Sequence, residues 1–218
     1  MNAFQKFLSY LFPVLIERVQ GELDHELSVY LHRGTLKLYS DKTNYSFGQL
    51  HKVFQRALKD FDFKEKANSR ILVLGFGVGS IASILRSELK VKAPMVGVEK
   101  DAMILEMYHS YFSKGYTDLR VIQQDALEYV KKDSEQFDLV FVDLFVDHAI
   151  PDFCYDEQFL ENLSRILSTS GTLLFNTISP SLSISSFENG LSRSFIIQSK
   201  KQIFGDNCVY FLKKRKTS

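Results

Sequence analysis

Cysteine is scarce in this sequence. Only two of its 218 residues are cysteines, Cys154 and Cys208, and neither belongs to a CxxC or histidine-rich motif. This spacing argues against a disulfide framework and against a structural zinc site. We therefore expect two free thiols, no bound metal and a reducing, cytoplasmic location.

An excess of charge of one sign is also missing. The chain has 27 basic and 26 acidic residues, which gives a net charge of +1. Such a chain has no global field that would attract nucleic acid or an anionic membrane, so we expect neither as a partner. We interpret the basic cluster at residues 213–216 as a solvated tail.

A hydrophobic run long enough to cross a membrane is absent as well. The best candidate, residues 7–16, is about half as long as a bilayer requires and contains Pro13. Glu17 and Arg18 follow it, where a signal peptide would have small residues at its cleavage site. The simplest remaining interpretation is a helix that docks on the core.

The composition is that of an ordinary soluble domain, with 45% hydrophobic and 24% charged residues. Residues 27–40 alternate apolar and polar side chains on both sides of Arg33-Gly34, and this pattern predicts a β-hairpin. Ser46 and Gln49 have the spacing of a capping box, which predicts a helix from Ser46 onward.

We expect two parts: an N-terminal helix and β-hairpin module, residues 1–66, and an α/β domain, residues 67–218. In the second part, short apolar runs alternate with helical segments. The predicted strands are 71–74, 95–98, 120–123, 137–142, 172–177, 195–201 and 208–213, and the predicted helices are 80–89, 102–113, 126–131 and 156–167. This order predicts a doubly wound, mostly parallel seven-stranded sheet that ends in an antiparallel hairpin.

Three glycines, Gly75, Gly77 and Gly79, follow the first buried strand and precede a helix. Glycines at this place let the backbone turn tightly and approach a ligand closely, although a turn selected only for packing would look the same. Glu99 follows Gly79 by 20 residues, at the end of the next strand. A carboxylate there can accept hydrogen bonds from ribose hydroxyls, so the pair predicts a nucleoside-binding site.

Ser80 stands where a dinucleotide-binding GxGxxG motif would have its third glycine. That motif brings a helix N-terminus to a pyrophosphate. S-adenosylmethionine has no phosphate, so the GxGxG spelling suits it better.

Two aspartates follow later strands. Asp125, paired with Ala126, stands where an acceptor for the adenine amine is expected, but Asp125 would also serve as a helix N-cap. Asp143 closes the strand 137–142, at the edge of the sheet where ligands lie in open α/β folds. We predict that Asp143 is a general base, with loop solvation or capping as the alternative role.

Taken together, these motifs resemble the spermidine synthase family and its relatives with the class I S-adenosylmethionine-dependent methyltransferase fold. The segments that carry the resemblance are 71–79, 96–101, 124–126 and 137–143, and their order agrees over roughly residues 25 to 213. The resemblance implies that the three glycines line the amino-acid side of S-adenosylmethionine, or of its decarboxylated form. It further implies that Glu99 holds the ribose, Asp125 and Ala126 the adenine, and that Asp143 is the catalytic aspartate.

Three departures from that family concern the substrate. Val78 stands where spermidine synthases carry an aspartate that faces the aminopropyl ammonium, and Lys52 replaces a glutamate. The segment 143–147 is more apolar than the family's Asp-Ser-Ser-Asp-Pro segment. A diamine needs carboxylates to replace its hydration, so we expect a different, uncharged or anionic acceptor.

Tyr45, His51 and Asp147 are the expected substrate contacts, and His51 has an alternative role as a partly buried helix residue. The leading hypothesis is a spermidine synthase-like, S-adenosylmethionine-dependent methyltransferase that acts on an unidentified small-molecule acceptor. One alternative is a polyamine aminopropyltransferase that uses decarboxylated S-adenosylmethionine, and another is a non-catalytic cofactor-binding or assembly module. We also expect a homodimer formed through the hairpin 27–40, because an isolated two-stranded unit needs cover for its apolar face. The alternative is that the α/β domain of the same chain provides this cover.

Overall fold

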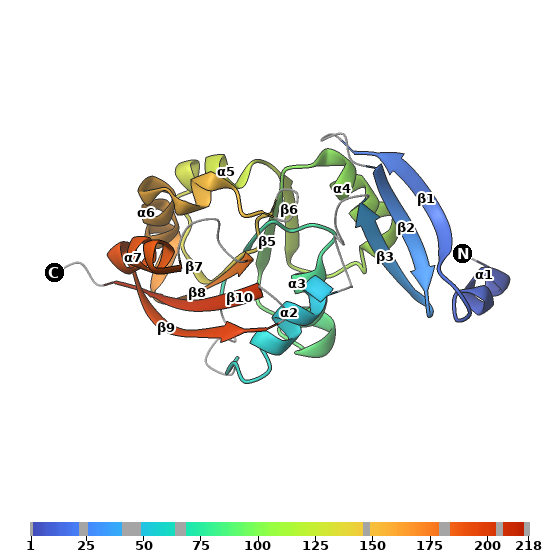
Figure 1. Ribbon diagram of the computed structural model, residues 1–218, viewed down its shortest axis with the longest axis horizontal. Coiled ribbons are helices and arrows are strands. Elements are labelled where there is room, and N and C mark those ends of the chain that lie inside the picture. Colours follow the sequence, from blue (N-terminus) through green and yellow to red (C-terminus); the bar gives the residue numbers. More distant parts are fainter. Residues whose placement is uncertain are drawn as a thin grey trace.

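The computed structural model describes residues 2–21, 26–40, 49–63, 69–145, 149–178, 184–203 and 207–215. Within them the chain forms a seven-stranded sheet in the order β6-β5-β4-β7-β8-β10-β9 and a three-stranded sheet in the order β1-β2-β3. Figure 1 shows the smaller sheet at the N-terminal end of the molecule, beside α4.

The large sheet confirms the predicted fold class. Its strands are β4 (Ile71–Leu74), β5 (Met95–Glu99), β6 (Leu119–Gln123), β7 (Phe137–Val142), β8 (Leu167–Ile178), β9 (Phe195–Gln202) and β10 (Asn207–Lys214). The first five run parallel to one another, whereas β10 is antiparallel to both β8 and β9. The sheet therefore ends in the expected antiparallel hairpin, whose turn at 204–206 lies outside the described residues.

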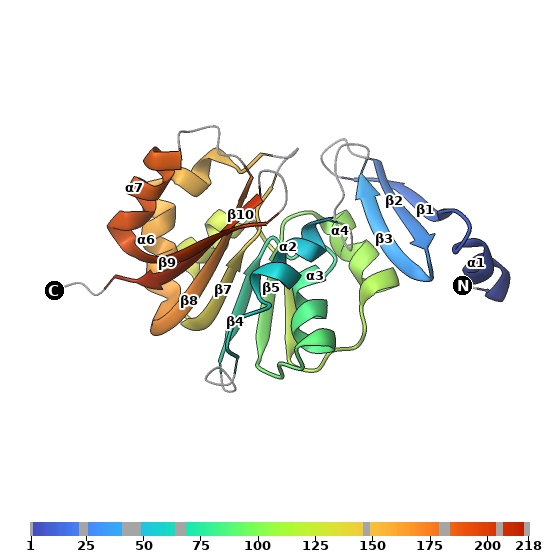
Figure 2. The ribbon, with the colours of Figure 1, turned by 60° about the horizontal axis from the view of Figure 1, so that its bottom comes forward.

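Helices cover both faces of this sheet (Figure 2). One face carries α2 (Gln49–Ala57), α3 (Ser80–Ser83) with its π-helical turn η2 (Ile84–Glu88), and α4 (Ala102–Met107) with its π-helical turn η3 (Tyr108–Phe112). The other carries α5 (Ala126–Lys132), the 3₁₀ turn η4 (Asp152–Tyr155), α6 (Glu157–Ile166) and α7 (Ile184–Ser194).

Side chains of β4 divide the core into two layers. Ile71 and Val73 pack with the first group of helices, and Leu72 and Leu74 pack with the second. All four side chains are buried, as expected for a parallel strand covered on both sides. This double cover leaves only the strand ends open to ligands.

The helix α7 has no counterpart among the predicted elements. Its sequence contains Gly190 and several serines, which lower intrinsic helix propensity. Phe187 and Leu191 lie four residues apart and are both buried, so packing against the sheet outweighs local preference.

The hairpin predicted at residues 27–40 is confirmed as β2 (Glu26–His32) and β3 (Thr35–Ser40). Leu27, Val29 and Leu38 belong to the core that also contains α2, α3 and α4 side chains. The same chain therefore covers the apolar face of the hairpin, and homodimerisation stays a prediction.

The interpretation of residues 7–16 as a core-docked helix is wrong. The helix α1 (Ala3–Leu8) has no buried residue, and a third strand, β1 (Val14–Gln20), begins directly after Pro13. Proline cannot continue a helix, and the β-branched residues that follow it favour a strand. None of the described helices is long and apolar enough to cross a membrane.

The helix predicted from Ser46 is described only from Gln49, because 41–48 lie outside the described residues. The proposed domain boundary near residue 66 also lies outside them and stays a prediction. The helix α2 itself packs on the large sheet, where the ring of Phe54 contacts Phe141 of β7 with 5.6 Å between centroids.

Replacement of Phe54 tests how much this contact stabilises the fold. Phe54 is 1% exposed, so Phe54→Ala should lower the free energy of unfolding by about 3–5 kcal/mol through lost burial and a residual cavity. The matched control is Phe4→Ala, since Phe4 on α1 is 67% exposed. Urea unfolding of both variants measures the difference, and equal losses would show that α2 does not depend on this packing.

Candidate functional site

The candidate residues gather where the parallel strands end. The chain passes from β4 to β5 on one side of β4 and later to β7 on its other side, so the strand order reverses at β4. Open α/β sheets bind ligands at such a reversal, beyond the carboxyl ends of the strands. Gly75, Glu99 and Asp143 end or follow the three central strands, so they lie at this edge.

The glycine loop touches the neighbouring strand end directly. Gly75 has a φ of +80°, and a Cβ on it would overlap the backbone carbonyl oxygen of Asp143. The N–H groups of Gly75 and Phe76 both donate to the carbonyl oxygen of Val98, at 3.0 and 2.9 Å. The loop therefore follows a path that places its backbone beside Asp143 and β5.

Glu99 anchors the same loop. Its Oε2 accepts the N–H of Gly77 at 2.8 Å, and its Oε1 accepts the N–H groups of Lys100 and Asp101 at 2.9 and 3.1 Å. Burial raises the pKa of this carboxyl, and the three hydrogen bonds oppose that rise. A carboxylate has about four acceptor positions, so Oε2 keeps room for one further donor.

Asp125 has the capping role that the sequence left open. As N-cap of α5, its Oδ1 accepts the N–H of Leu127 at 2.9 Å and that of Glu128 at 3.4 Å. Its Oδ2 lies 3.1 Å from Lys100 Nζ, an ion pair that sequence reasoning missed. Ala126 is buried in the first turn of α5. Contact of Asp125 and Ala126 with adenine stays a prediction.

Asp143 lies between the glycine loop and β8. Its backbone N–H donates to Leu74 of β4 at 2.9 Å, and its Oδ1 accepts the Nδ2–H of Asn176 at 2.9 Å. Burial raises the pKa of Asp143 to about 6, against the opposing effect of the Asn176 hydrogen bond. Asp143 is therefore mostly ionised at neutral pH and is close to the range where a carboxylate works as a general base.

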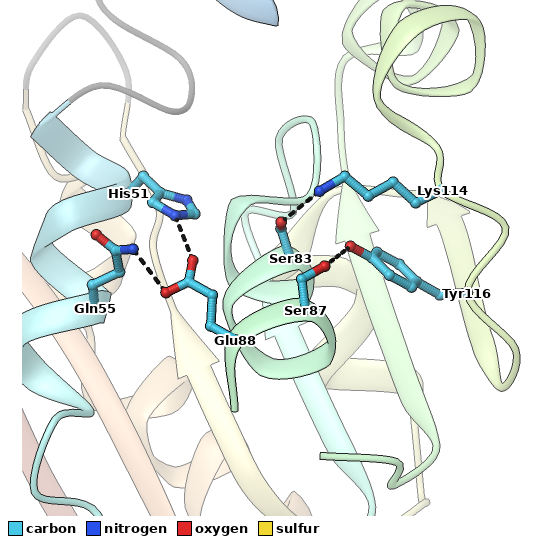
Figure 3. Close-up of polar contacts among 7 residues, drawn as sticks. All are labelled: His51, Gln55, Ser83, Ser87, Glu88, Lys114 and Tyr116. Atoms are coloured by element: carbon cyan, nitrogen blue, oxygen red, sulfur yellow. Dashed lines mark hydrogen bonds and ion pairs between the residues drawn. The ribbon is translucent and has the colours of Figure 1, made fainter. Parts of the chain in front are cut away.

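Among the expected substrate contacts, only His51 lies within the described residues, because Tyr45 and Asp147 are outside them. His51 is buried on α2, and its Nε2 is 3.1 Å from Glu88 Oε1 on η2 (Figure 3). Gln55 of α2 donates to the other oxygen of Glu88 at 2.8 Å. These contacts support the alternative role of His51 as a partly buried helix residue and add a link between α2 and η2 that was not predicted. Substrate contact stays a prediction.

Figure 3 also shows two polar contacts on the other side of the same helix. Lys114 Nζ donates to Ser83 Oγ at 3.2 Å, and the hydroxyls of Ser87 and Tyr116 are 2.8 Å apart. The pKa of His51 is lowered by burial and, to a smaller extent, by the positive charge of Lys114, whereas the contact with Glu88 raises it. The helix that follows the glycine loop is thus fixed from both sides.

A cavity of about 380 Å³ lies at the opposite, amino edge of the sheet. Its lining includes Arg70, Asp118, Arg120 and Glu135. Arg70 is already paired with Glu135 at 2.6 Å, and its guanidinium stacks over Phe137. None of the candidate residues at the carboxyl edge lines this cavity.

Comparison with known proteins gives one family match and several relatives. A family described as "Methyltransferase domain" matches residues 65–212. The polyamine aminopropyltransferase of Vibrio vulnificus is 34% identical over 116 residues, which are 51% of this chain and 38% of that protein. The chain therefore matches less than half the length of this relative.

Solved structures agree with the fold. A probable spermidine synthase from Corynebacterium glutamicum superposes with a TM-score of 0.70 at 13% identity, covering 95% of this chain and 82% of the other. Human methyltransferase-like protein 13, solved with SAH, gives a TM-score of 0.65 at 22% identity, covering 77% of this chain and 83% of the other. At these identities the likeness establishes the shared fold.

Replacement of Gly75 tests whether the close approach to Asp143 matters beyond backbone conformation. Gly75→Ala should destabilise the protein by more than about 2 kcal/mol, because it adds a steric overlap to the cost of a positive φ. Gly115→Ala is the matched control, since Gly115 has a φ of +61° with open space around its Cβ position. We expect urea unfolding to show the larger loss at Gly75, and similar losses would contradict the described loop path.

Proposed function

The chain belongs to the methyltransferase domain family, and on that premise we propose that it is a transferase that uses S-adenosylmethionine or its decarboxylated form. The observation that carries the proposal is the hydrogen bond between Gly77 of the glycine loop and the half-buried carboxylate of Glu99, beside Asp143. In our proposal the glycines leave room for a ligand, Glu99 accepts from its ribose and Asp143 is the base. All three features lie at the carboxyl edge of the sheet.

The residues at this edge fit an adenosyl ligand. Gly77, which brings no side chain to this edge, donates to Glu99, and Glu99 Oε2 keeps an acceptor position for a ribose hydroxyl. We assign the adenine amine to Asp125, whose side chain is fixed at the N-terminus of α5 by its capping bonds. When bound, the sulfonium ligand supplies an electrophilic carbon.

Asp143 has the role of base in this proposal. Its carboxylate accepts the proton of the acceptor's nucleophilic group, and a pKa of about 6 keeps it ionised at pH 7 without making it a very weak base. In this proposal, the remaining acceleration over the uncatalysed reaction comes from alignment of donor and acceptor beside the glycine loop.

We place methyl transfer to a small acceptor first. Val78 is buried at 1% exposure and offers no carboxylate to a bare aminopropyl ammonium. The second candidate is aminopropyl transfer to an amine, which the similarity to polyamine aminopropyltransferases favours. The proposal includes a reducing, cytoplasmic location, in keeping with two free cysteines, and a homodimer.

Thermal melts with four ligands separate the two candidates. A ligand at a hundredfold excess over its dissociation constant adds about 2.7 kcal/mol, a readable shift in Tm. We expect S-adenosylmethionine and S-adenosylhomocysteine to stabilise more than decarboxylated S-adenosylmethionine and methylthioadenosine. The reverse preference, enhanced by putrescine, would replace methyl transfer by aminopropyl transfer. No response to any ligand would leave the non-catalytic module.

The control for the melts is removal of the ribose acceptor. Glu99→Ala should weaken binding of S-adenosylhomocysteine by about 1–3 kcal/mol, measured by calorimetry, because a hydrogen bond to a charged group is lost. Glu135→Ala removes a carboxylate from the opposite edge of the sheet and should leave the affinity unchanged. Unchanged affinity in folded Glu99→Ala would remove the ribose assignment.

The base assignment has its own test once an acceptor is found. Asp143→Asn should keep the affinity for S-adenosylhomocysteine while turnover falls by about 10² to 10⁴, the range for losing general base catalysis. Asparagine keeps an oxygen that can accept from Asn176, so the fold is preserved. Normal turnover would return Asp143 to a structural role.

A further inference from the structure

We propose that Asn176 is a positioning residue for Asp143: it holds Oδ1 of the carboxylate, so that Oδ2 is the atom that takes the proton of the acceptor. The inference rests on the proposed function for the proton transfer. The hydrogen bond between the two side chains, in contrast, is a property of the chain without ligand.

The register of the sheet brings the two residues together. β7 and β8 are parallel neighbours in which Val142 is opposite Phe175, so the next residues, Asp143 and Asn176, also meet. On its other side Asn176 is opposite Val209 of β10. The side chain is thus fixed between two strands, and its Nδ2 donates to Asp143 Oδ1 at 2.9 Å.

The orientation of the amide follows from the chemistry of its partner. An ionised carboxylate only accepts hydrogen bonds, so the Nδ2 of Asn176, which can donate, must face Asp143. In this orientation Asn176 Oδ1 is buried without a hydrogen-bond partner in the described part of the chain. A buried acceptor without a hydrogen bond lowers the stability of the fold. The hydrogen bond from Asn176 to Asp143 is therefore formed at the expense of some folding stability.

The next residue on the strand provides a contrast. Thr177 is as buried as Asn176, at 1% exposure, but its Oγ1 donates to the carbonyl oxygen of Cys208 at 3.1 Å. The polar group of Thr177 is therefore satisfied by the sheet itself. Asn176 instead donates its hydrogen bond to Asp143, the side chain that the proposed reaction needs.

The bond has a definite effect on Asp143. Burial raises the pKa of Asp143, and the Asn176 hydrogen bond is the one described contact that lowers it. The neighbouring carboxylates Glu99 and Asp125, at the ends of β5 and β6, are not among the causes of the shift. Among the described residues, Oδ2 receives no hydrogen bond, so it is the oxygen available for a proton.

The proton transfer then has a fixed direction. The N–H or O–H bond of the nucleophile breaks, and its proton forms an O–H bond at Asp143 Oδ2. The nucleophile's electron pair forms the new bond to the carbon of the donor, and the electrons of the broken carbon–sulfur bond remain on sulfur, which becomes a neutral thioether. A carboxylate free to rotate would present Oδ2 in this direction only part of the time.

The first test needs no substrate. In the ligand-free protein, the ¹³C carboxyl signal of Asp143, assigned with Asp143→Asn, is titrated in wild type, Asn176→Leu and Thr177→Val. Asn176→Leu removes the donor while keeping the number and branching of the side-chain heavy atoms, and it should raise the pKa of Asp143. Thr177→Val, a matched change at the next buried position, should leave it unchanged. An unchanged pKa in folded Asn176→Leu would overturn the proposal.

A second variant, Asn176→Asp, provides the same test if Asn176→Leu does not fold. Asn176→Asp has nearly the same shape and replaces the donor by a second carboxylate, so the two carboxylates should titrate as a coupled pair, with one step above the wild-type pKa of Asp143. An Asp143 titration equal to that of wild type in this variant would equally overturn the positioning role. Both results stand whether or not an adenosyl ligand binds, so they are distinct from failure of the proposed function.

The kinetic test applies when turnover is measurable. Asn176→Leu should lower kcat at pH 7 by at least about tenfold and move the acid limb of the kcat profile to higher pH, with the affinity for S-adenosylhomocysteine unchanged. A merely structural role would lower stability without moving the pH profile. Thr177→Val should retain the wild-type profile, and a profile for Asn176→Leu equal to it would contradict the proposal.

Discussion

The hydrogen bond from the Gly77 N–H to the carboxylate of Glu99 holds the candidate site together. Glu99 is half-buried at the end of β5, where its carboxylate accepts hydrogen bonds from three backbone N–H groups, one of them that of Gly77 in the glycine loop. A carboxylate partly withdrawn from water is costly without such donors, so the loop and the carboxylate require one another. Through this bond the glycine loop keeps the path on which Gly75 reaches the carbonyl oxygen of Asp143.

Asp143 extends this organisation to the second half of the sheet. Its backbone is bonded to β4, its carbonyl oxygen contacts the glycine loop, and its carboxylate is bonded to Asn176 of β8. A displacement of any of these strands would therefore move the proposed base. In this arrangement the same contacts that order the central strands also position the proposed base.

Much of this was readable from the sequence, because buried parallel strands appear as short apolar runs and their glycine and acidic residues follow at fixed places. The helix α7 was missed because packing rather than local propensity determines it, whereas the strand β1 was missed although Pro13 and the β-branched residues after it favour a strand. Asn176 and the Lys100 ion pair were missed for another reason. Asn176 meets Asp143 only because β8 pairs with β7 in one register, and no local pattern around either residue signals that contact.

A crystal structure of the protein with S-adenosylhomocysteine would test the proposed site most directly. We expect a ribose hydroxyl within hydrogen-bond distance of Glu99, the adenine beside Asp125, and the sulfur near Gly75 and Asp143. A ligand bound elsewhere, for example in the cavity lined by Arg70 at the amino edge of the sheet, would contradict this expectation.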